Sequence, residues 1–157
     1  MLNLAIKSIK KESDSDKALV FAMNKYNNIY TGMNFDGQPI DVRKPIQLPE
    51  RLAKNLENNS NIDIKDRYSF SNCRAILTEL LNGNVNVGIT NVLRNSDGII
   101  RKVAPLMEYK DNYYPYLAFL AGSNYLAGEN VKGFTIDKSS NLIVQDTKIP
   151  LTEYGEA

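Results

Sequence analysis

The spacing of apolar residues in the first quarter of the chain predicts one helix followed by one strand. Residues 15–27 repeat apolar side chains on a single helical face, behind Ser13 and Asp16, which fit a capping box. Residues 29–35 are short and aromatic and lead to Asp36-Gly37, which is typical of a strand that ends in a turn. The apolar positions of the helix are Leu19, Val20, Met23 and Tyr26.

Two further helices are predicted before residue 84. In residues 48–59, Pro49 suits a first helical position and leucines recur every four residues, which indicates a short surface helix. The Asn-rich residues after it are interpreted as a loop. A third helix is expected from Ser71, as its N-cap, to Leu81, with Gly83 placed to end it.

The period changes to two at Val85, which predicts strands. Val85, Val87, Ile89 and Leu93 share one face, and Asn91 interrupts them, so a buried or half-buried amide is expected there. A second strand is expected from Ile99, where apolar residues occupy both faces.

These two strands are expected to form a hairpin. A three-residue loop over 96–98, with its glycine in the left-handed conformation, pairs Leu93 with Arg101 and Asn91 with Val103. The Asn91 and Arg101 side chains then lie on the same face among apolar neighbours. Both need partners, because an unpaired buried guanidinium is very costly, so Arg101 is predicted to point inward.

The last third of the chain predicts another hairpin, a buried helix and short strands. The hairpin is centred on Asp111-Asn112, and the nearly all-apolar helix begins at Pro115 and ends at Gly128. Segments 133–137, 141–146 and 148–151 are strand candidates. The whole chain, residues 1–157, is therefore expected to form one α+β domain of the broader α/β class, with a mixed, largely antiparallel central sheet packed by helices.

Composition removes several functions. Nineteen basic and eighteen acidic side chains leave a net charge of +1, which provides no broad electrostatic surface for nucleic acid. The chain has no histidine, which excludes His-dependent nucleophile pairs and most zinc sites. Its single cysteine, Cys73, lies among apolar residues and is expected to be a buried, inert thiol. No apolar run is long enough to span a bilayer.

The block from residue 88 to residue 126 contains a Gly and an Asn on one predicted strand, an Asp-Gly turn, an Arg, a Pro-Leu pair and an aromatic-Pro-x-Leu-Ala helix start. The residues of this pattern are Gly88, Asn91, Asp97, Gly98, Arg101, Pro105, Leu106, Tyr114, Pro115, Leu117 and Ala118. The block closely resembles the second type of CHASE domain, the extracellular sensory domain of bacterial receptors associated with cyclases and histidine kinases.

The match has two departures. Tyr116 stands where family members often have Ser, and the family's usual first strand-helix-strand unit has no counterpart here. Within these limits the resemblance implies a non-catalytic sensor domain, without a cofactor, outside the cytoplasmic membrane. The rest of the receptor, with transmembrane helices and a nucleotide cyclase or histidine kinase as output, is expected to lie outside this chain.

The candidate ligand site combines Arg101, whose guanidinium can grip a carboxylate in two places, with Asn91 and Tyr114 as orienting groups. No metal ligands are expected. A structural role, in which Arg101 caps carbonyls or pairs with an acid such as Asp97, is the favoured alternative, and Lys102 is interpreted as a solvated edge charge. The residues expected to shape the motif are Gly88, Asp97, Gly98, Pro105 and Pro115.

Two other functions remain alternatives to a sensor of a small anionic signal. The domain can be an interaction module that forms a receptor homodimer without any small ligand. It can also be a small cytosolic enzyme that uses carboxylates such as Asp63 and Asp66, although this spacing is common by chance.

Overall fold

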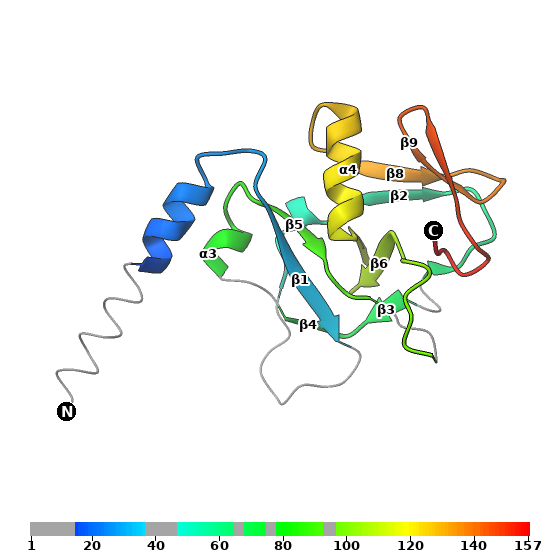
Figure 1. Cartoon of the computed structure of the whole chain (residues 1–157), viewed down its shortest axis with the longest axis horizontal. Coiled ribbons are helices and arrows are strands. Elements are labelled where there is room, and N and C mark those ends of the chain that lie inside the picture. Colours follow the sequence, from blue (N-terminus) through cyan, green and yellow to red (C-terminus); the bar gives the residue numbers. More distant parts are fainter. Residues whose placement is uncertain (1–14, 37–46, 65–67, 75–77, 93–96) are drawn as a thin grey trace.

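The computed structural model describes residues 15–36, 47–64, 68–74, 78–92 and 97–157, and they form an α+β fold, as predicted (Figure 1). The strands are distributed over three small mixed sheets rather than one central sheet. The elements are helical residues 15–23, β1 (Tyr30–Asp36), η1 (Glu50–Leu52), β2 (Asn55–Asn58), β3 (Ser69–Phe70), β4 (Asn72–Arg74), α3 (Thr78–Leu81), β5 (Asn86–Ile89), β6 (Leu106–Tyr109), β7 (Asn112–Pro115), α4 (Leu117–Ala127), β8 (Gly133–Ile136), β9 (Asn141–Val144) and β10 (Thr147–Pro150).

Each sheet combines parallel and antiparallel neighbours. The first has the order β4-β1-β5, the second β10-β9-β8-β2 and the third β3-β6-β7. The pairs β1-β5, β2-β8 and β3-β6 are parallel, and the other pairs are antiparallel. A bridge between Lys54 and Tyr113 joins the second sheet to the third.

The hairpin and the C-terminal strands were predicted correctly. The β6-β7 turn is Lys110-Asp111, one residue earlier than expected, and its φ values of 51° and 63° are those of a tight hairpin turn. Strands β8, β9 and β10 occupy the three predicted segments. The helix α4 ends at Gly128, whose φ of 69° is left-handed, as the sequence predicts.

The predicted helix over residues 48–59 is wrong. A single 3₁₀ turn, η1, ends at Ala53, whose φ of −66° and ψ of 149° are extended. The chain continues as β2, which pairs in parallel with β8. The hydrogen bonds to β8 therefore override the four-residue leucine spacing, of which only Leu48 and Leu52 are buried.

The helix predicted from Ser71 is also wrong in its first part. Residues 72–74 form β4, antiparallel to the edge of β1, and in the described part of this segment only Thr78–Leu81 is helical. The predicted end is right, because the Gly83 N–H donates to the Leu80 carbonyl.

The strand predicted from Ile99 does not form, since residues 99–104 have no regular structure and β6 begins at Leu106. Val103 exchanges two backbone hydrogen bonds with Ala157, at 3.1 and 3.0 Å, instead of pairing with Asn91. The predicted pairing of Leu93 with Arg101 stays a prediction, because residues 93–96 lie outside the described residues. A contact with the far end of the chain thus replaces the local one.

Two helices are more exposed than predicted. Residues 15–23 are helical, shorter than expected, and their Leu19 is 49% exposed, although Val20 and Met23 pack against the core. In Figure 1 this helix extends from one end of the molecule. The helix α4 buries one face only, since Tyr125 is 86% exposed. Ser13 of the predicted capping box lies outside the described residues, and Pro115 ends β7 rather than opening the helix.

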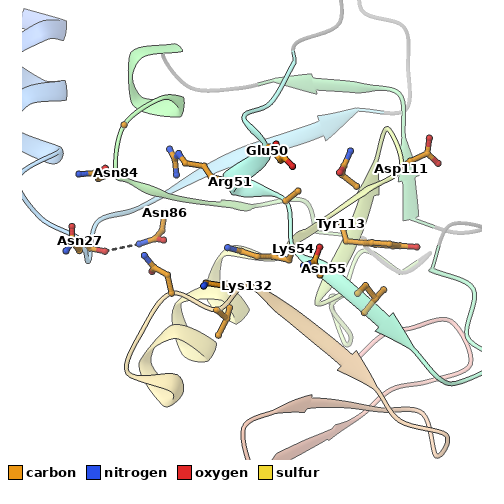
Figure 2. A pocket seen from close by; sticks show the side chains of 16 residues that line it. Asn27, Glu50, Arg51, Lys54, Asn55, Asn84, Asn86, Asp111, Tyr113 and Lys132 are labelled. Carbon is orange, nitrogen blue, oxygen red and sulfur yellow. Dashed lines mark hydrogen bonds between the residues drawn. The ribbon is translucent and has the colours of Figure 1, made fainter.

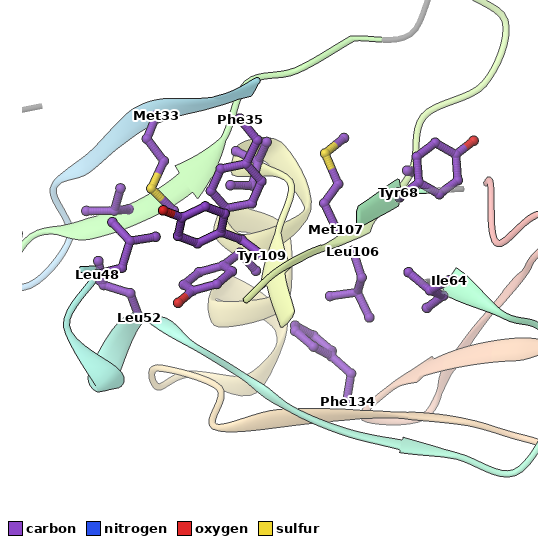
Figure 3. Close-up of a cluster of buried hydrophobic side chains, with 14 of the residues drawn as sticks. Met33, Phe35, Leu48, Leu52, Ile64, Tyr68, Leu106, Met107, Tyr109 and Phe134 are labelled. Carbon is purple, nitrogen blue, oxygen red and sulfur yellow. The ribbon is translucent and has the colours of Figure 1, made fainter. Parts of the chain in front are cut away.

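The core lies between the three sheets and contains an aromatic cluster (Figure 3). The Phe35 ring stacks on Tyr109 at a centroid distance of 5.0 Å and meets Tyr114 edge-on at 5.5 Å. Cys73 is buried beside Met33, with 3.9 Å between the two sulfurs. The prediction of a buried thiol is confirmed.

Cys73 is expected to react slowly with iodoacetamide in the folded protein. Burial raises the pKa of its thiol from 9.0 to about 11, so the thiolate fraction at pH 8 is about a hundredfold lower than normal. The unfolded chain ionises first, so stability falls as pH rises from about 9 to about 11. Mass spectrometry at timed intervals, with and without denaturant, measures the rate. Equal rates in both conditions would contradict burial of the thiol.

Candidate functional site

The structure does not hold Arg101 inside the fold. Its side chain is 51% exposed, and Nη1 donates to Asp97 Oδ2 at 2.7 Å. The Ile99 backbone N–H and then Arg101 hold the pKa of the Asp97 carboxyl below its usual value. The inward prediction is therefore wrong, whereas the alternative of an Arg101-Asp97 pair is confirmed. The reason is local, because the Asp97-Gly98 turn, with Gly98 at φ 79°, presents the acid directly to Arg101.

The expected half-buried amide at Asn91 is confirmed, with a structural role. Its Nδ2 donates to the Phe35 carbonyl and its Oδ1 accepts from the Phe35 N–H, both at 2.6 Å. Asn91 therefore extends the pairing of β1 beyond the end of β5. The partner that the sequence required is backbone, not Arg101.

Tyr114 belongs to the core, with 3% exposure, and burial raises the pKa of its hydroxyl to about 12. Arg101 lies at the surface and Asn91 is occupied by Phe35, so the structure does not bring the three predicted ligand residues together in one site.

The remaining predicted positions are structural or exposed. Gly88 lies where β5 touches α4, and the Pro105 carbonyl accepts from the Tyr116 N–H. Lys102 is half exposed, 3.6 Å from Glu156. Asp63 is exposed and Asp66 lies outside the described residues. No group of His, Cys, Asp or Glu that could hold a metal is found in the part of the chain that the structure describes.

A polar cavity lies where the three sheets meet (Figure 2). We call it the amide cleft, and its volume is about 880 Å³. Its walls come from η1 and β2, from the turn before β5, from the β6-β7 turn and from the segment before β8. It is lined by Asn27, Glu50, Arg51, Ala53, Lys54, Asn55, Leu56, Gly83, Asn84, Asn86, Asp111, Asn112, Tyr113, Asn130, Val131 and Lys132.

Arg51 fixes one wall of the amide cleft. Its Nη1 donates to the Val85 carbonyl at 3.1 Å and its Nη2 to the Leu81 carbonyl at 2.5 Å. These bonds join η1 to the turn between α3 and β5. Partial burial lowers the pKa of Arg51, which nevertheless stays cationic, and no carboxylate partner is found for it in the described residues.

Lys54 and Lys132 supply two further positive charges. The Lys54 backbone N–H donates to the Tyr113 carbonyl at 2.8 Å, which places its half-buried side chain where the second and third sheets join. Burial, and then the charge of Arg51, lower the pKa of Lys54. Within the described ranges neither lysine forms an ion pair. Figure 2 shows both side chains extending toward the part of the cleft that contains Asn86, whereas Asp111 lies beyond Tyr113.

Amide side chains surround these cations. Asn86 is buried and its Nδ2 donates to the Asn27 carbonyl at 3.0 Å. The side chains of Asn27, Asn55 and Asn84 make no hydrogen bond to any described residue, so their donors and acceptors face the cleft or solvent. The arrangement can bind a small anion and hydrogen-bond polar groups around it.

The residues of the amide cleft are scattered along the sequence, and no local pattern predicts that they meet. The leucine spacing of residues 48–59 predicts a surface helix and gives no link from Arg51 and Lys54 to Lys132, which lies 81 and 78 positions later. The unusual density of Asn was the only available signal.

Comparisons with protein-family models, with curated proteins and with solved structures found no match to this chain. Among the described residues, no helix has the length and apolar character needed to cross a membrane.

Proposed function

We propose that this chain is a non-catalytic sensor domain that binds a small anionic molecule in the amide cleft. The observation that carries the proposal is the convergence of Arg51, Lys54 and Lys132 on one cavity without an ion-pair partner in the described residues. Two acids, Glu50 and Asp111, also line the cleft, so the three cations leave its lining with a net positive charge. Cations without an ion-pair partner attract an anion, and their mutual repulsion is relieved when it binds.

The position of the amide cleft suits a sensor. A ligand held there contacts β2, β5 and β7, which belong to three different sheets. A ligand shifts a conformational equilibrium only when it binds one state more tightly than another, and a ligand between sheets depends on their relative positions. The resemblance of residues 88–126 to a second-type CHASE domain supports placing this sensor outside the cytoplasmic membrane of a bacterial receptor with a cyclase or histidine kinase output.

Small anions are expected to raise the melting temperature of the purified protein, and Lys54→Met is expected to weaken this effect. The probes are inorganic phosphate, succinate and citrate, followed by differential scanning fluorimetry and calorimetric titration, since a ligand of the folded state stabilises it. Loss of one charge-assisted hydrogen bond should raise Kd roughly tenfold or more. The Lys132→Met variant should behave in the same way.

Two variants serve as controls. Lys138→Met removes an exposed lysine outside the cleft. Arg101→Ala removes the residue that the sequence offered as the candidate for binding an anion. Both should bind the probes as the parent chain does. Equal weakening in all four variants would indicate general charge screening, and no shift with any probe would contradict an anion site.

Exposed apolar side chains favour a second candidate function, a dimerisation module. Phe21 is 67% exposed, and Tyr125 and Leu126 on α4 are 86% and 54% exposed. Sedimentation velocity across a range of protein concentrations tests it. A monomer at all concentrations would exclude this candidate, and a dimer that ignores the anion probes would favour it over the sensor.

A further inference from the structure

We infer that the ligand of the amide cleft is an anionic sugar, whose acidic group is held by Lys54 and Lys132 and whose hydroxyls are held by Asn27, Asn55 and Asn84. This inference rests on the proposed function and adds the chemical class of the ligand. The observation behind it is that one cavity is lined both by cations and by amide side chains that make no hydrogen bond to any described residue.

Two of the three cations of the cleft, Arg51 and Lys54, belong to segments that hydrogen bonds hold in place. The Lys54 backbone is tied to Tyr113, and Arg51 is held in place by two carbonyls, those of Leu81 and Val85. Two guanidinium nitrogens of Arg51 already donate to these carbonyls. The ammonium groups of Lys54 and Lys132 are therefore more available to a ligand. An acidic group bound by two lysines contributes attraction but little shape recognition, because an ammonium group is a compact point charge.

The amides provide the shape recognition. Each amide side chain offers two donors and a carbonyl acceptor, and a sugar hydroxyl also donates and accepts. Asn27, Asn55 and Asn84 retain this full capacity in the described structure, and they come from three separate segments of the chain. Figure 2 shows Asn27 and Asn84 on one side of Lys54 and Asn55 on the other. A sugar whose acidic group binds Lys54 would carry hydroxyls on several sides of that group, where they can bond to these amides.

The size and polarity of the cleft agree with a sugar. A volume of about 880 Å³ is within the usual range for small-molecule sites and leaves ample space around a simple inorganic anion. The apolar lining is limited to a few side chains, namely Ala53, Leu56, Val131 and the ring of Tyr113. The exposed amides Asn27, Asn55 and Asn84 would gain no hydrogen bond from a hydrophobic acid, whereas the hydroxyls of a sugar can bond to them.

The acidic group can be a carboxylate or a phosphate, because ammonium groups bind both. The test therefore uses glucuronate and glucose 6-phosphate as two arms, with acetate, inorganic phosphate and glucose as the matching simple ligands, in isothermal titration calorimetry on the whole chain. At least one anionic sugar is expected to bind about tenfold more tightly than its simple anion and than glucose, the effect of about two added hydrogen bonds.

Variants separate the two parts of the cleft. Asn55→Ala and Asn84→Ala should weaken binding of the anionic sugar several-fold without changing the affinity for the simple anion. The double variant Lys54→Met with Lys132→Met should lose both ligands. Asn59→Ala removes an exposed amide that is bonded to Glu57 and does not line the cleft, so it should bind normally.

The outcomes distinguish this inference from the function on which it rests. If a simple anion binds as tightly as both anionic sugars, the inference of a sugar ligand is contradicted, whereas the proposed anion-binding function is retained. If glucose binds as tightly as the anionic sugars, the lysines do not recognise an acidic group. That result contradicts both the proposed function and the inference. If none of the five ligands binds, the proposed function fails together with the inference.

Discussion

Replacing Gly88 by alanine should lower the free energy of unfolding by about 3 kcal/mol, the upper part of the range for overpacking a well-packed interior. A Cβ atom at this position would lie 2.5 Å from the Leu117 Cα and 3.0 Å from the Leu117 backbone nitrogen. These are backbone atoms of the first turn of α4, so they cannot move aside as the end of a flexible side chain does. Either α4 or β5 must shift.

Gly122→Ala is the matched control on the same helix. Nothing lies within 4 Å of a Cβ atom added there, and Gly122 is exposed within α4. Alanine should therefore stabilise the protein by about 0.5–1 kcal/mol. Urea denaturation followed by circular dichroism measures both variants. Similar stabilities for the two variants would show that α4 does not pack on β5 as closely as described.

The Tyr114→Ala variant should lose about 4 kcal/mol, the cost of truncating a large aromatic side chain in a core. Tyr114 is 3% exposed, and its ring contacts Phe35 edge-on and lies 6.4 Å from the Tyr109 ring, measured between centroids. Loss of the ring leaves a cavity among aromatic neighbours that cannot all collapse into it.

Tyr114→Phe separates this structural role from the ligand role that the sequence suggested. It keeps the ring and removes only the hydroxyl, so it should remain folded, with a midpoint close to that of the parent chain. It should also bind the anion probes of the amide cleft with unchanged affinity. The checks are urea denaturation and calorimetric titration. A folded Tyr114→Phe protein that no longer binds would restore Tyr114 as a ligand residue.

The sequence alone predicted elements whose determinants are local. The β6-β7 hairpin follows from a short polar turn between strand-forming residues, and the end of α4 at Gly128 follows from the left-handed conformation that glycine adopts easily. The same reasoning correctly identified a buried Cys73 and an amide at Asn91 that needs partners. These depend on neighbours in the sequence or on the cost of burying a polar group.

The candidate site depended on contacts that no local pattern contains. Arg101 turned outward because Asp97, four residues away, offered a partner at no cost of burial. Lys54 became part of a cleft because β2 pairs with β8 and its own N–H bonds to Tyr113, 59 positions later. Such pairings are chosen among many strand partners of similar composition.

Local periodicity, turn chemistry and the absence of histidine thus determined the α+β class, the C-terminal strands and the exclusion of His-dependent catalysis from the sequence by itself. Tertiary structure alone decided that residues 55–58 and 72–74 are strands and that Arg51, Lys54 and Lys132 meet in one cavity. The physical reason is that backbone hydrogen bonds between distant strands outweigh the small helix propensities of individual residues, and they set which side chains converge.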